Sequence, residues 1–328
     1  MPKLQPQLSK QNNLGRRLAS VLVMAVLVLI AVAQPRPLSS QFQNFLSSPG
    51  MSHATVTFEL LRLPNTPSTQ APTIAQPAVT RGQVIYSYDA ERMVAPASVM
   101  KLLTAATGFR LLGADYVWPD SIGMIDTAAV ALPGLERYNP DWLIEDIDTD
   151  YMPPLDNVLP DSGRVLSDVM HETLVKSLNL QAETMLCLLT PSCRRDSAIE
   201  CVRQYWEQRG LDMESLVMYD GSGLSPNDRV TAHLMSSLLA DMQFDRDYRR
   251  AIAIAGREGT VRRFFRDTRL DGKAWLKTGT LKNVLAYAGY IEGSDGKTYA
   301  MSIFVSNSTC RHAELRKRIE KLLLSLIP

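Results

Sequence analysis

The stretch that decides the fold is residues 95–112, which read APASVMKLLTAATGFRLL. Pro96 interrupts the extended segment before it. The apolar positions that follow repeat at helical spacing and predict a helix that begins near Ser98. The expected buried face of this helix consists of Leu102, Ala105, Ala106, Phe109 and Leu112.

Ser98 and Lys101 are three residues apart, so their side chains leave the same face of the first helical turn. Free backbone N–H groups at that turn favour a negative charge that develops there. A serine, an adjacent amine and such N–H groups are the parts of an acyl-transfer nucleophile. The pattern alone is not specific, because Ser294 and Lys297 repeat it in an apparent hairpin turn. A helix cap beside a solvated lysine is the alternative interpretation.

The composition describes an ordinary globular chain of 328 residues, 45% apolar and 21% charged, with room for one large or two modest domains. Lys and Arg (35) nearly balance Asp and Glu (34), which gives no reason to expect nucleic acid as a partner. The four histidines are dispersed and no Cys-x-x-Cys pair exists, so neither a metal nor another cofactor is expected. Three disulfide connectivities remain open for the four cysteines, Cys187, Cys193, Cys201 and Cys310.

The N-terminus has the pattern of an export signal. Basic residues precede an apolar run over 18–33, which ends in Ala-Val-Ala before Gln34. The run is shorter than the roughly 20 residues of a typical membrane-spanning helix. We therefore expect a signal peptide over 1–33, cleaved after Ala33, and an extracytoplasmic location in the periplasm or cell envelope. The alternative is an uncleaved segment that attaches the protein to the membrane.

The remaining elements alternate between strand and helix patterns. Strands are predicted on both sides of a helical middle, at 54–61, 82–88, 273–280, 284–291 and 298–305, and a short strand is predicted within it at 213–219. Helices are predicted at 164–189 with a break at 176–179, at 196–209, at 231–242 after the cap Thr231, from 257 onward, and at 313–326. The Pro-rich segment 113–163 is irregular, and we expect it to wrap the surface and form part of a cleft wall.

This order predicts an α+β fold with a mixed or antiparallel sheet built from both chain ends, flanking helices and a helical subdomain. The sheet half would comprise 34–112 and 271–328. The irregular segment and the helical half would comprise 113–270.

Three short motifs follow one another: Ser98-x-x-Lys101, Ser177-Leu178-Asn179 and Lys277-Thr278-Gly279. Each is weak alone, and Ser225-Pro226-Asn227 also satisfies the second. Their order, in an exported chain with a helical middle between two sheet halves, is far more specific.

On these motifs the chain resembles the penicillin-recognising serine acyltransferases. Within them it is most similar to the class C low-molecular-mass penicillin-binding proteins, the D-alanyl-D-alanine carboxypeptidase/endopeptidases. Segments 219–231, 255–260 and 277–290 also resemble that family. Two features depart from it: no large inserted domain fits between the first two motifs, and Leu178 stands where aspartate is common. The resemblance implies a β-lactamase/transpeptidase-like fold.

The resemblance also implies catalytic roles. Ser98 would attack a carbonyl and form an acyl-enzyme. Lys101 would be its base, with a pKa lowered towards neutral by burial and by the charge of Lys277. Ser177 would relay a proton to the leaving amine, and Asn179 would orient Lys101 and hold a substrate amide.

The third motif would bind the substrate. Lys277 and Thr278 would hold its terminal carboxylate, and Gly279 would let the strand approach it closely. The backbone N–H groups of Ser98 and Thr280 would form the oxyanion hole.

The expected function is cleavage of D-Ala-D-Ala ends or D-amino-acid cross-links in peptidoglycan stem peptides, with β-lactams as acylating ligands. A β-lactamase or esterase on the same scaffold is the first alternative. It is disfavoured because no Glu-x-x-Leu-Asn segment precedes the third motif and no Tyr-x-Asn replaces Ser-x-Asn. The second alternative is a non-catalytic cell-wall scaffold protein with a vestigial site.

Overall fold

The computed structural model describes residues 39–66, 82–118, 163–191 and 193–328. The predicted signal segment 1–33 and most of the irregular segment 113–163 lie outside these residues. In the described part of the chain, no helix is both long and apolar enough to cross a membrane.

The described part is built on one five-stranded sheet in the order β2-β1-β5-β4-β3. All neighbouring strands are antiparallel, and β1 from the N-terminal part pairs with β5 from the C-terminal part. The prediction of a sheet assembled from both chain ends is thus confirmed. The strands are β1 (Thr55–Arg62), β2 (Gln83–Tyr88), β3 (Ala274–Leu281), β4 (Val284–Glu292) and β5 (Thr298–Ser306).

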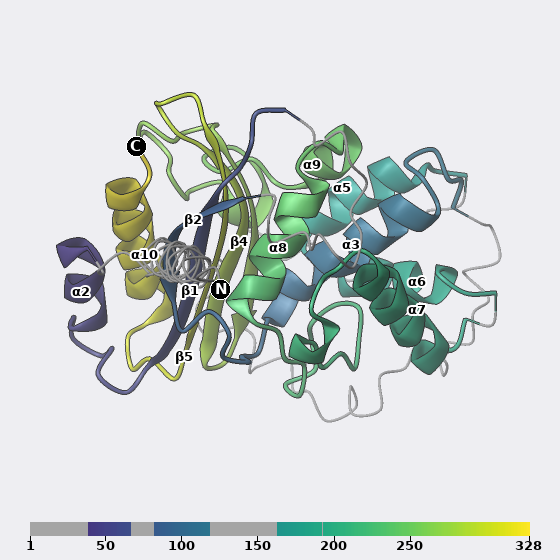
Figure 1. The fold of residues 1–328 in the computed structure, drawn as a ribbon, viewed down its shortest axis with the longest axis horizontal. Coiled ribbons are helices and arrows are strands. Elements are labelled where there is room, and N and C mark those ends of the chain that lie inside the picture. Colours follow the sequence, from purple (N-terminus) through teal and green to yellow (C-terminus); the bar gives the residue numbers. More distant parts are fainter. Residues whose placement is uncertain (1–38, 67–81, 119–162, 192) are drawn as a thin grey trace, which may run out of the picture. The chain divides into compact units, whose positions relative to one another are not determined.

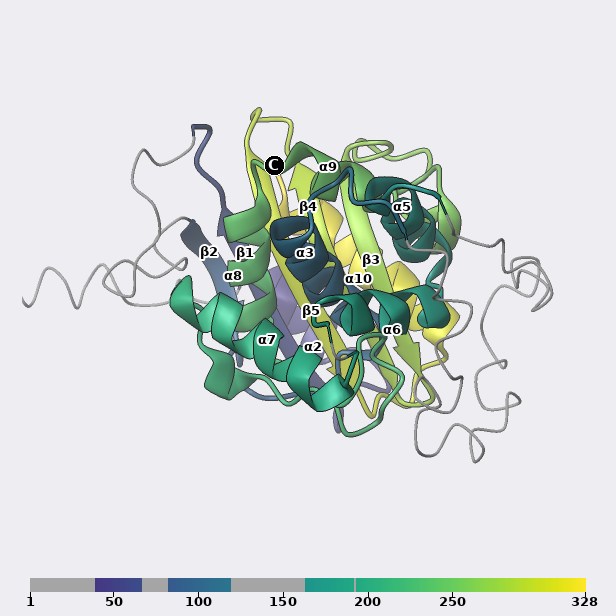
Figure 2. The same cartoon turned by 90° about the vertical axis from the view of Figure 1, so that its right-hand side faces the viewer.

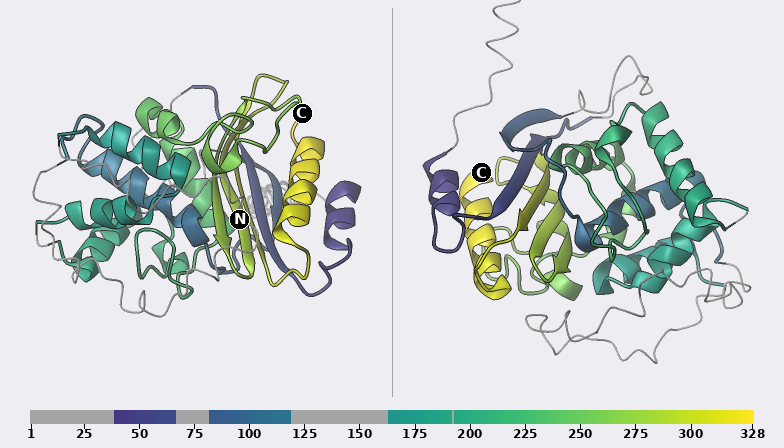
Figure 3. Two further views of the ribbon diagram at one scale, coloured as in Figure 1. Left: turned by 180° about the vertical axis from the view of Figure 1, so that it is seen from behind. Right: turned by 90° about the horizontal axis from the view of Figure 1, so that it is seen from below.

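Helices cover both faces of this sheet. The C-terminal helix α10 (His312–Leu326) packs on one face, with α2 (Ser40–Leu46) against it, and α8 (Ala232–Met242) packs on the other (Figure 1). Because side chains alternate along a strand, Ile303 enters the core beneath α10 and its neighbour Phe304 the core beneath α8. The central strands are therefore apolar on both faces. Views from behind and below show the same three layers (Figure 3).

The helix predicted from residues 95–112 is α3 (Met100–Leu111), and it occupies the middle of the helical layer (Figure 2). The prediction of a single buried face is wrong in extent, because every residue from Met100 to Phe109 is buried. Helices pack against α3 from several sides, so the polar residues of its first turns are buried as well. These neighbours are α5 (Leu166–Lys176), α6 (Asn179–Leu188), α7 (Arg195–Gln208), α8 and α9 (Arg246–Ala251).

Most predicted boundaries agree with the structure. The break between α5 and α6 falls at Ser177, and the Thr231 hydroxyl caps α8 by accepting from the N–H of Leu234. The strand predicted over 213–219 is wrong. The Asp212 carboxylate accepts from the N–H of Glu214 and tightens the chain into the 3-10 turn η7 (Met213–Ser215). The helix expected from 257 onward is the short 3-10 turn η8 (Gly259–Val261).

The structure also settles a pairing that the sequence left open. Cys187, on α6, forms a disulfide with Cys193 in the loop after that helix. Cys201 and Cys310 are free thiols. The disulfide therefore ties α6 to the loop that leads into α7.

Candidate active site

The candidate nucleophile Ser98 lies in the 3-10 turn η2 (Ala97–Val99), directly before α3. Ala97 has φ +48°, an uncommon value for a residue with a side chain, and such values concentrate at functional positions. The turn is clamped from two sides by glycines. A Cβ on Gly279 of β3 would lie 2.5 Å from the Pro96 carbonyl oxygen, and one on Gly223 would lie 1.8 Å from that of Ala97. Both approaches therefore require glycine.

Lys101 is 1% exposed, and its Nζ has three neighbours. It lies 2.7 Å from Asn179 Oδ1, 2.7 Å from the Ser222 carbonyl oxygen and 2.9 Å from Ser98 Oγ. A neutral amine has two N–H groups and one lone pair. The amide and carbonyl oxygens can only accept, whereas the Ser98 hydroxyl can also donate. A neutral Lys101 would therefore direct its lone pair at Ser98.

Burial lowers the pKa of Lys101 to about 7, against the opposing charges of Asp220, Glu183 and Asp228. The expected role of Lys277 in this shift is corrected. Burial is the cause at Lys101, while the charge of Lys101 acts on Lys277 and, second to burial, lowers its pKa well below its usual value.

The second motif connects the two lysines. Asn179, the first residue of α6, accepts from Lys101, and Ser177 Oγ accepts from Lys277 Nζ at 2.9 Å. Ser177 can face β3 because its backbone is left-handed, with φ +63°, which ends α5. Leu178 donates its N–H to the Thr173 carbonyl and has no part in these bonds. The unusual leucine therefore leaves the network intact.

The third motif lies on the edge strand β3. Lys277 is fully buried and also donates to the Thr278 carbonyl at 2.9 Å. The Thr278 hydroxyl lies 2.9 Å from that of Thr260, which belongs to η8. Bonds to residues 253–255 cover the start of the outer edge of β3, up to Leu276. In the described residues no strand pairs with that edge beyond this point, where the motif begins.

Gly279 also has a close contact within the protein that the sequence did not reveal. Its approach to the substrate stays a prediction, and its missing side chain admits the Pro96–Ala97 turn. Gly279 thus sets the distance between β3 and Ser98. The oxyanion hole from the N–H groups of Ser98 and Thr280 stays a prediction.

The sequence missed the loop 219–228 as part of the site. The Asp220 carboxylate accepts from four successive backbone N–H groups, those of residues 222–225, and Glu183 on α6 accepts from those of Gly221 and Ser222. Buried Asp228 accepts from Tyr219, and burial together with the charge of Asp220 raises its pKa to about 8. One signal could have revealed Glu183: it lies four residues after Asn179, on the same helix face.

Metal ligation finds no support in the parts of the chain that the structure describes, where no group of three or more His, Cys, Asp or Glu side chains could hold an ion. The buried carboxylates near Lys101 are instead occupied by backbone donors.

Comparison with known proteins identifies the class. The fold is that of a β-lactamase/transpeptidase-like protein. Penicillin-binding protein 4 from Haemophilus influenzae, solved with a novel β-lactam, superposes with a TM-score of 0.62 at 14% identity, covering 88% of this chain and 100% of that one. The profile of the D-Ala-D-Ala carboxypeptidase 3 (S13) family matches residues 59–122 and 162–326. The chain belongs to this family, which confirms the resemblance seen in the motifs.

Two curated relatives match over shorter stretches. A D-alanyl-D-alanine carboxypeptidase of Actinomadura sp. (strain R39) is 31% identical over 110 residues, 31% of this chain and 20% of that protein. A penicillin-sensitive carboxypeptidase A of Dictyostelium discoideum is 23% identical over 176 residues, 49% of this chain and 34% of that protein. The matches span about a third or less of these relatives.

Proposed function

We propose that the protein is a serine-type D-Ala-D-Ala carboxypeptidase/endopeptidase that acts on peptidoglycan stem peptides through an acyl-enzyme on Ser98. The observation that carries this proposal is the environment of Lys101. Two acceptors engage its N–H groups, and its third neighbour, at 2.9 Å, is the Ser98 hydroxyl. With a pKa of about 7, the amine is largely neutral just above neutral pH and able to accept the Ser98 proton.

In the proposed reaction, Ser98 Oγ attacks the carbonyl carbon of the penultimate D-alanine while its proton passes to Lys101. The N–H groups of Ser98 and Thr280 stabilise the oxyanion, an effect typically worth about 10²–10³-fold in rate for each donor. The C–N bond then breaks, and the leaving amine takes a proton through Ser177. Water hydrolyses the ester and restores Ser98.

The carboxylate of the terminal D-alanine would bind Lys277 and the Thr278 hydroxyl. A β-lactam carries a carboxylate and a strained amide in a similar relation, so we propose that penicillins acylate Ser98. The Haemophilus influenzae structure holds a β-lactam, and the Dictyostelium discoideum relative is named penicillin-sensitive, which supports this choice of ligand.

We further propose that the chain is exported to the periplasm or cell envelope, where peptidoglycan is found, on the basis of the apolar segment 18–33. Intact mass of the protein recovered from an envelope fraction tests this. A mass that begins at Gln34 supports cleavage, and the full-length mass in the membrane fraction supports attachment. Recovery of the full-length chain in the cytoplasm contradicts export.

The test of activity is incubation of the protein with a fluorescent penicillin, followed by a denaturing gel and intact mass. We expect a one-to-one adduct that disappears in Ser98→Ala. Ser294→Ala is the matched control, because it removes the serine of the second Ser-x-x-Lys pattern, and it should label normally. Absence of an adduct on folded protein contradicts the proposal.

Turnover then separates the remaining alternatives. Release of D-alanine from a stem pentapeptide indicates a carboxypeptidase, and cleavage of cross-linked dimers an endopeptidase. An adduct that forms and is rapidly hydrolysed indicates a β-lactamase. A lasting adduct without activity on any peptide indicates the scaffold protein.

A further inference from the structure

The two acceptors that hold Lys101 come from different segments, yet both are anchored to the same helix. Asn179, which bonds Lys101 directly, is the first residue of α6. Glu183 follows one turn later on the same face and bonds the loop whose Ser222 carbonyl is the second acceptor. We propose that Glu183 is a positioning residue that fixes the Ser222 carbonyl relative to Asn179 and thereby holds Lys101 on Ser98. The proposal builds on the function proposed above.

The contacts of Glu183 determine the orientation of the loop. Its Oε1 accepts from the N–H of Ser222 at 2.8 Å, and its Oε2 from that of Gly221 at 3.1 Å. The N–H of Ser222 belongs to the peptide group that joins Gly221 to Ser222. The carbonyl of the same peptide group, from Gly221, accepts from the Thr104 hydroxyl of α3 at 2.7 Å. The N–H and C=O of a trans peptide point in opposite directions. This peptide is therefore fixed between α6 and α3.

The next peptide group carries the carbonyl that Lys101 uses. Its N–H, from Gly223, donates to Asp220 Oδ1 at 2.5 Å, while the Ser222 carbonyl accepts from Lys101. Asp220 belongs to the loop itself and can only fix its internal shape. Glu183 and Thr104 tie that shape to the helices around the site. Of these two, only Glu183 shares its helix with the other acceptor, Asn179.

Charge adds a second effect of Glu183. The charged groups that act on Lys101 are the carboxylates of Asp220, Glu183 and Asp228, while the Lys277 amine on β3 is itself acted on by Lys101. The negative charges raise the Lys101 pKa against burial. Burial and Asp220 raise the pKa of Glu183 itself, but both of its oxygens accept from N–H donors, an arrangement that suits the ionised form. Loss of this charge should therefore lower the Lys101 pKa.

The test compares Glu183→Gln with wild type by two measurements. The first follows Lys101 directly, as the ¹³C resonance of [ε-¹³C]lysine-labelled protein that is missing in Lys101→Arg. We expect its titration midpoint to fall by about half a pH unit in Glu183→Gln. The second is the rate of acylation by a fluorescent penicillin between pH 5 and 9. We expect a loss of about tenfold at the optimum, with an acidic limb shifted to lower pH by the same amount.

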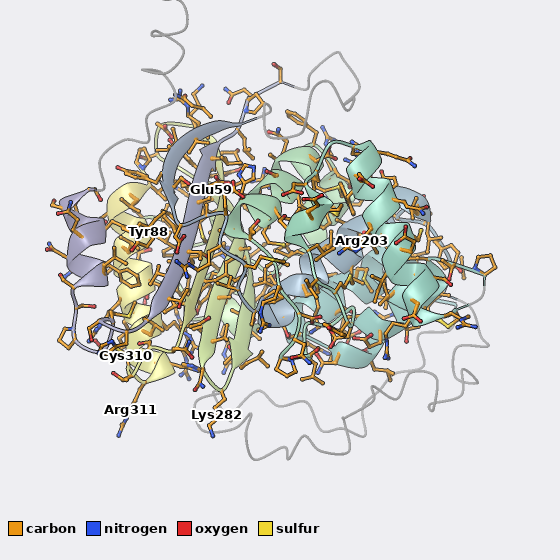
Figure 4. All side chains as sticks on the ribbon, turned by 60° about the horizontal axis from the view of Figure 1, so that its bottom comes forward. Glu59, Tyr88, Arg203, Lys282, Cys310 and Arg311 are labelled. Carbon is orange, nitrogen blue, oxygen red and sulfur yellow. A yellow bond between two sulfur atoms is a disulfide. The ribbon has the colours of Figure 1, made fainter. Side chains whose placement is uncertain are left out.

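Glu59→Gln is the matched control. Glu59 is also a buried glutamate, on β1 (labelled in Figure 4), but its carboxylate bonds His233 and Ser236 of α8. This variant should leave the Lys101 midpoint and the acidic limb in place, even if it lowers stability. A purely structural role of Glu183 would reduce the rate equally at every pH without moving the midpoint, and that result overturns the proposal.

A second variant separates position from charge and serves if Glu183→Gln does not fold. Glu183→Asp keeps the charge but shortens the reach by one methylene. We expect its acylation rate to fall about tenfold with the acidic limb near that of wild type. An unchanged rate contradicts the positioning role.

The two measurements also distinguish this inference from the proposed function. If the wild-type protein resists acylation but the Lys101 midpoint shifts in Glu183→Gln, the proposed enzymatic function is contradicted. The same result supports the effect of Glu183 on Lys101. If wild type is acylated normally and Glu183→Gln changes neither measurement, the positioning role of Glu183 is contradicted and the proposed enzymatic function stands.

Discussion

Two buried lysines, one on each side of the site, differ in what surrounds their charge. Lys101 on α3 has three oxygen neighbours and acts within the fields of three carboxylates. Lys277 on β3 bonds a hydroxyl and a backbone carbonyl, and within the described part of the chain the charge that acts on it is the repulsive one of Lys101. Burial is equal and the residue type is the same. The carboxylates therefore oppose the effect of burial on the pKa of Lys101, whereas the charge of Lys101 adds to the effect of burial on the pKa of Lys277.

From this difference we expect the two amines to have different tasks. A pKa of about 7 suits a base that must accept a proton and return it near neutral pH. Among the residues that the structure describes, no carboxylate is identified as acting on Lys277, whose pKa is held well below its usual value. A bound substrate carboxylate would provide that missing partner. We therefore expect the ligand to complete the charge balance at Lys277, as the protein does at Lys101.

The largest effect should follow from removal of the two amines in turn. In Lys101→Met we expect the limiting acylation rate to fall about 10³-fold, because the base is lost. In Lys277→Met we expect ligand affinity to fall about tenfold or more, because a charged hydrogen bond is lost, with a smaller change in the limiting rate. Acylation measured against penicillin concentration separates the two parameters.

Lys282→Met is the control for this pair. Lys282 is an exposed lysine at the end of the β3–β4 hairpin, where Figure 4 shows it pointing away from the sheet. Its replacement should leave both parameters unchanged. Equal losses of the same parameter in Lys101→Met and Lys277→Met would refute the division of tasks.

The next effect concerns Gly279, where the two regions meet. In Gly279→Ala the new Cβ would overlap the Pro96 carbonyl oxygen, so β3 must move away from the Ser98 turn. We expect a loss of about 1–3 kcal/mol in the free energy of unfolding and of about a hundredfold in acylation rate. Denaturant unfolding and penicillin labelling measure the two losses.

Gly82→Ala, before β2, is the comparison for this substitution. Its Cβ would meet Leu61 Cβ at 3.1 Å, far from the site, and acylation should remain normal. Wild-type acylation in Gly279→Ala would mean that the contact between β3 and the turn is not needed.

The smallest effect is a proton taken up on binding. Above its lowered pKa, Lys277 is neutral in the free protein, and a bound carboxylate raises that pKa. Affinity for a D-Ala-D-Ala peptide should therefore fall as the pH rises, by up to about tenfold per unit, with uptake of about one proton. Calorimetry of Ser98→Ala in buffers of different ionisation enthalpy counts the protons.

The same peptide with a C-terminal amide is the matched ligand. It lacks the charge that would stabilise protonated Lys277, so it should bind weakly and without proton uptake. Equal proton uptake with both ligands would show that the carboxylate does not interact with Lys277.

The sequence predicted those features that depend on local order along the chain. Period-two and helical patterns placed the strands and most helices, and the break at Ser177 was visible because two helical patterns stop there. It misjudged the segment 213–219, where the Asp212 cap outweighs strand propensity. It also missed α9, a short helix started by the Asp245 cap. In both segments, a hydrogen bond from a backbone N–H to an aspartate at the cap determined the secondary structure.

At the site, the sequence by itself determined which residues are proposed to carry the chemistry, because Ser98, Lys101, Ser177, Asn179 and Lys277 lie in motifs whose spacing can be read along the chain. Only the tertiary structure decided how they act. The Lys101 pKa depends on the burial of α3 on every side and on carboxylates from α6 and a distant loop, and the field of a charge depends on distance in space. Likewise, the glycine at position 279 predicted that another group comes close to β3. Only the tertiary structure showed that the Pro96 carbonyl is such a group.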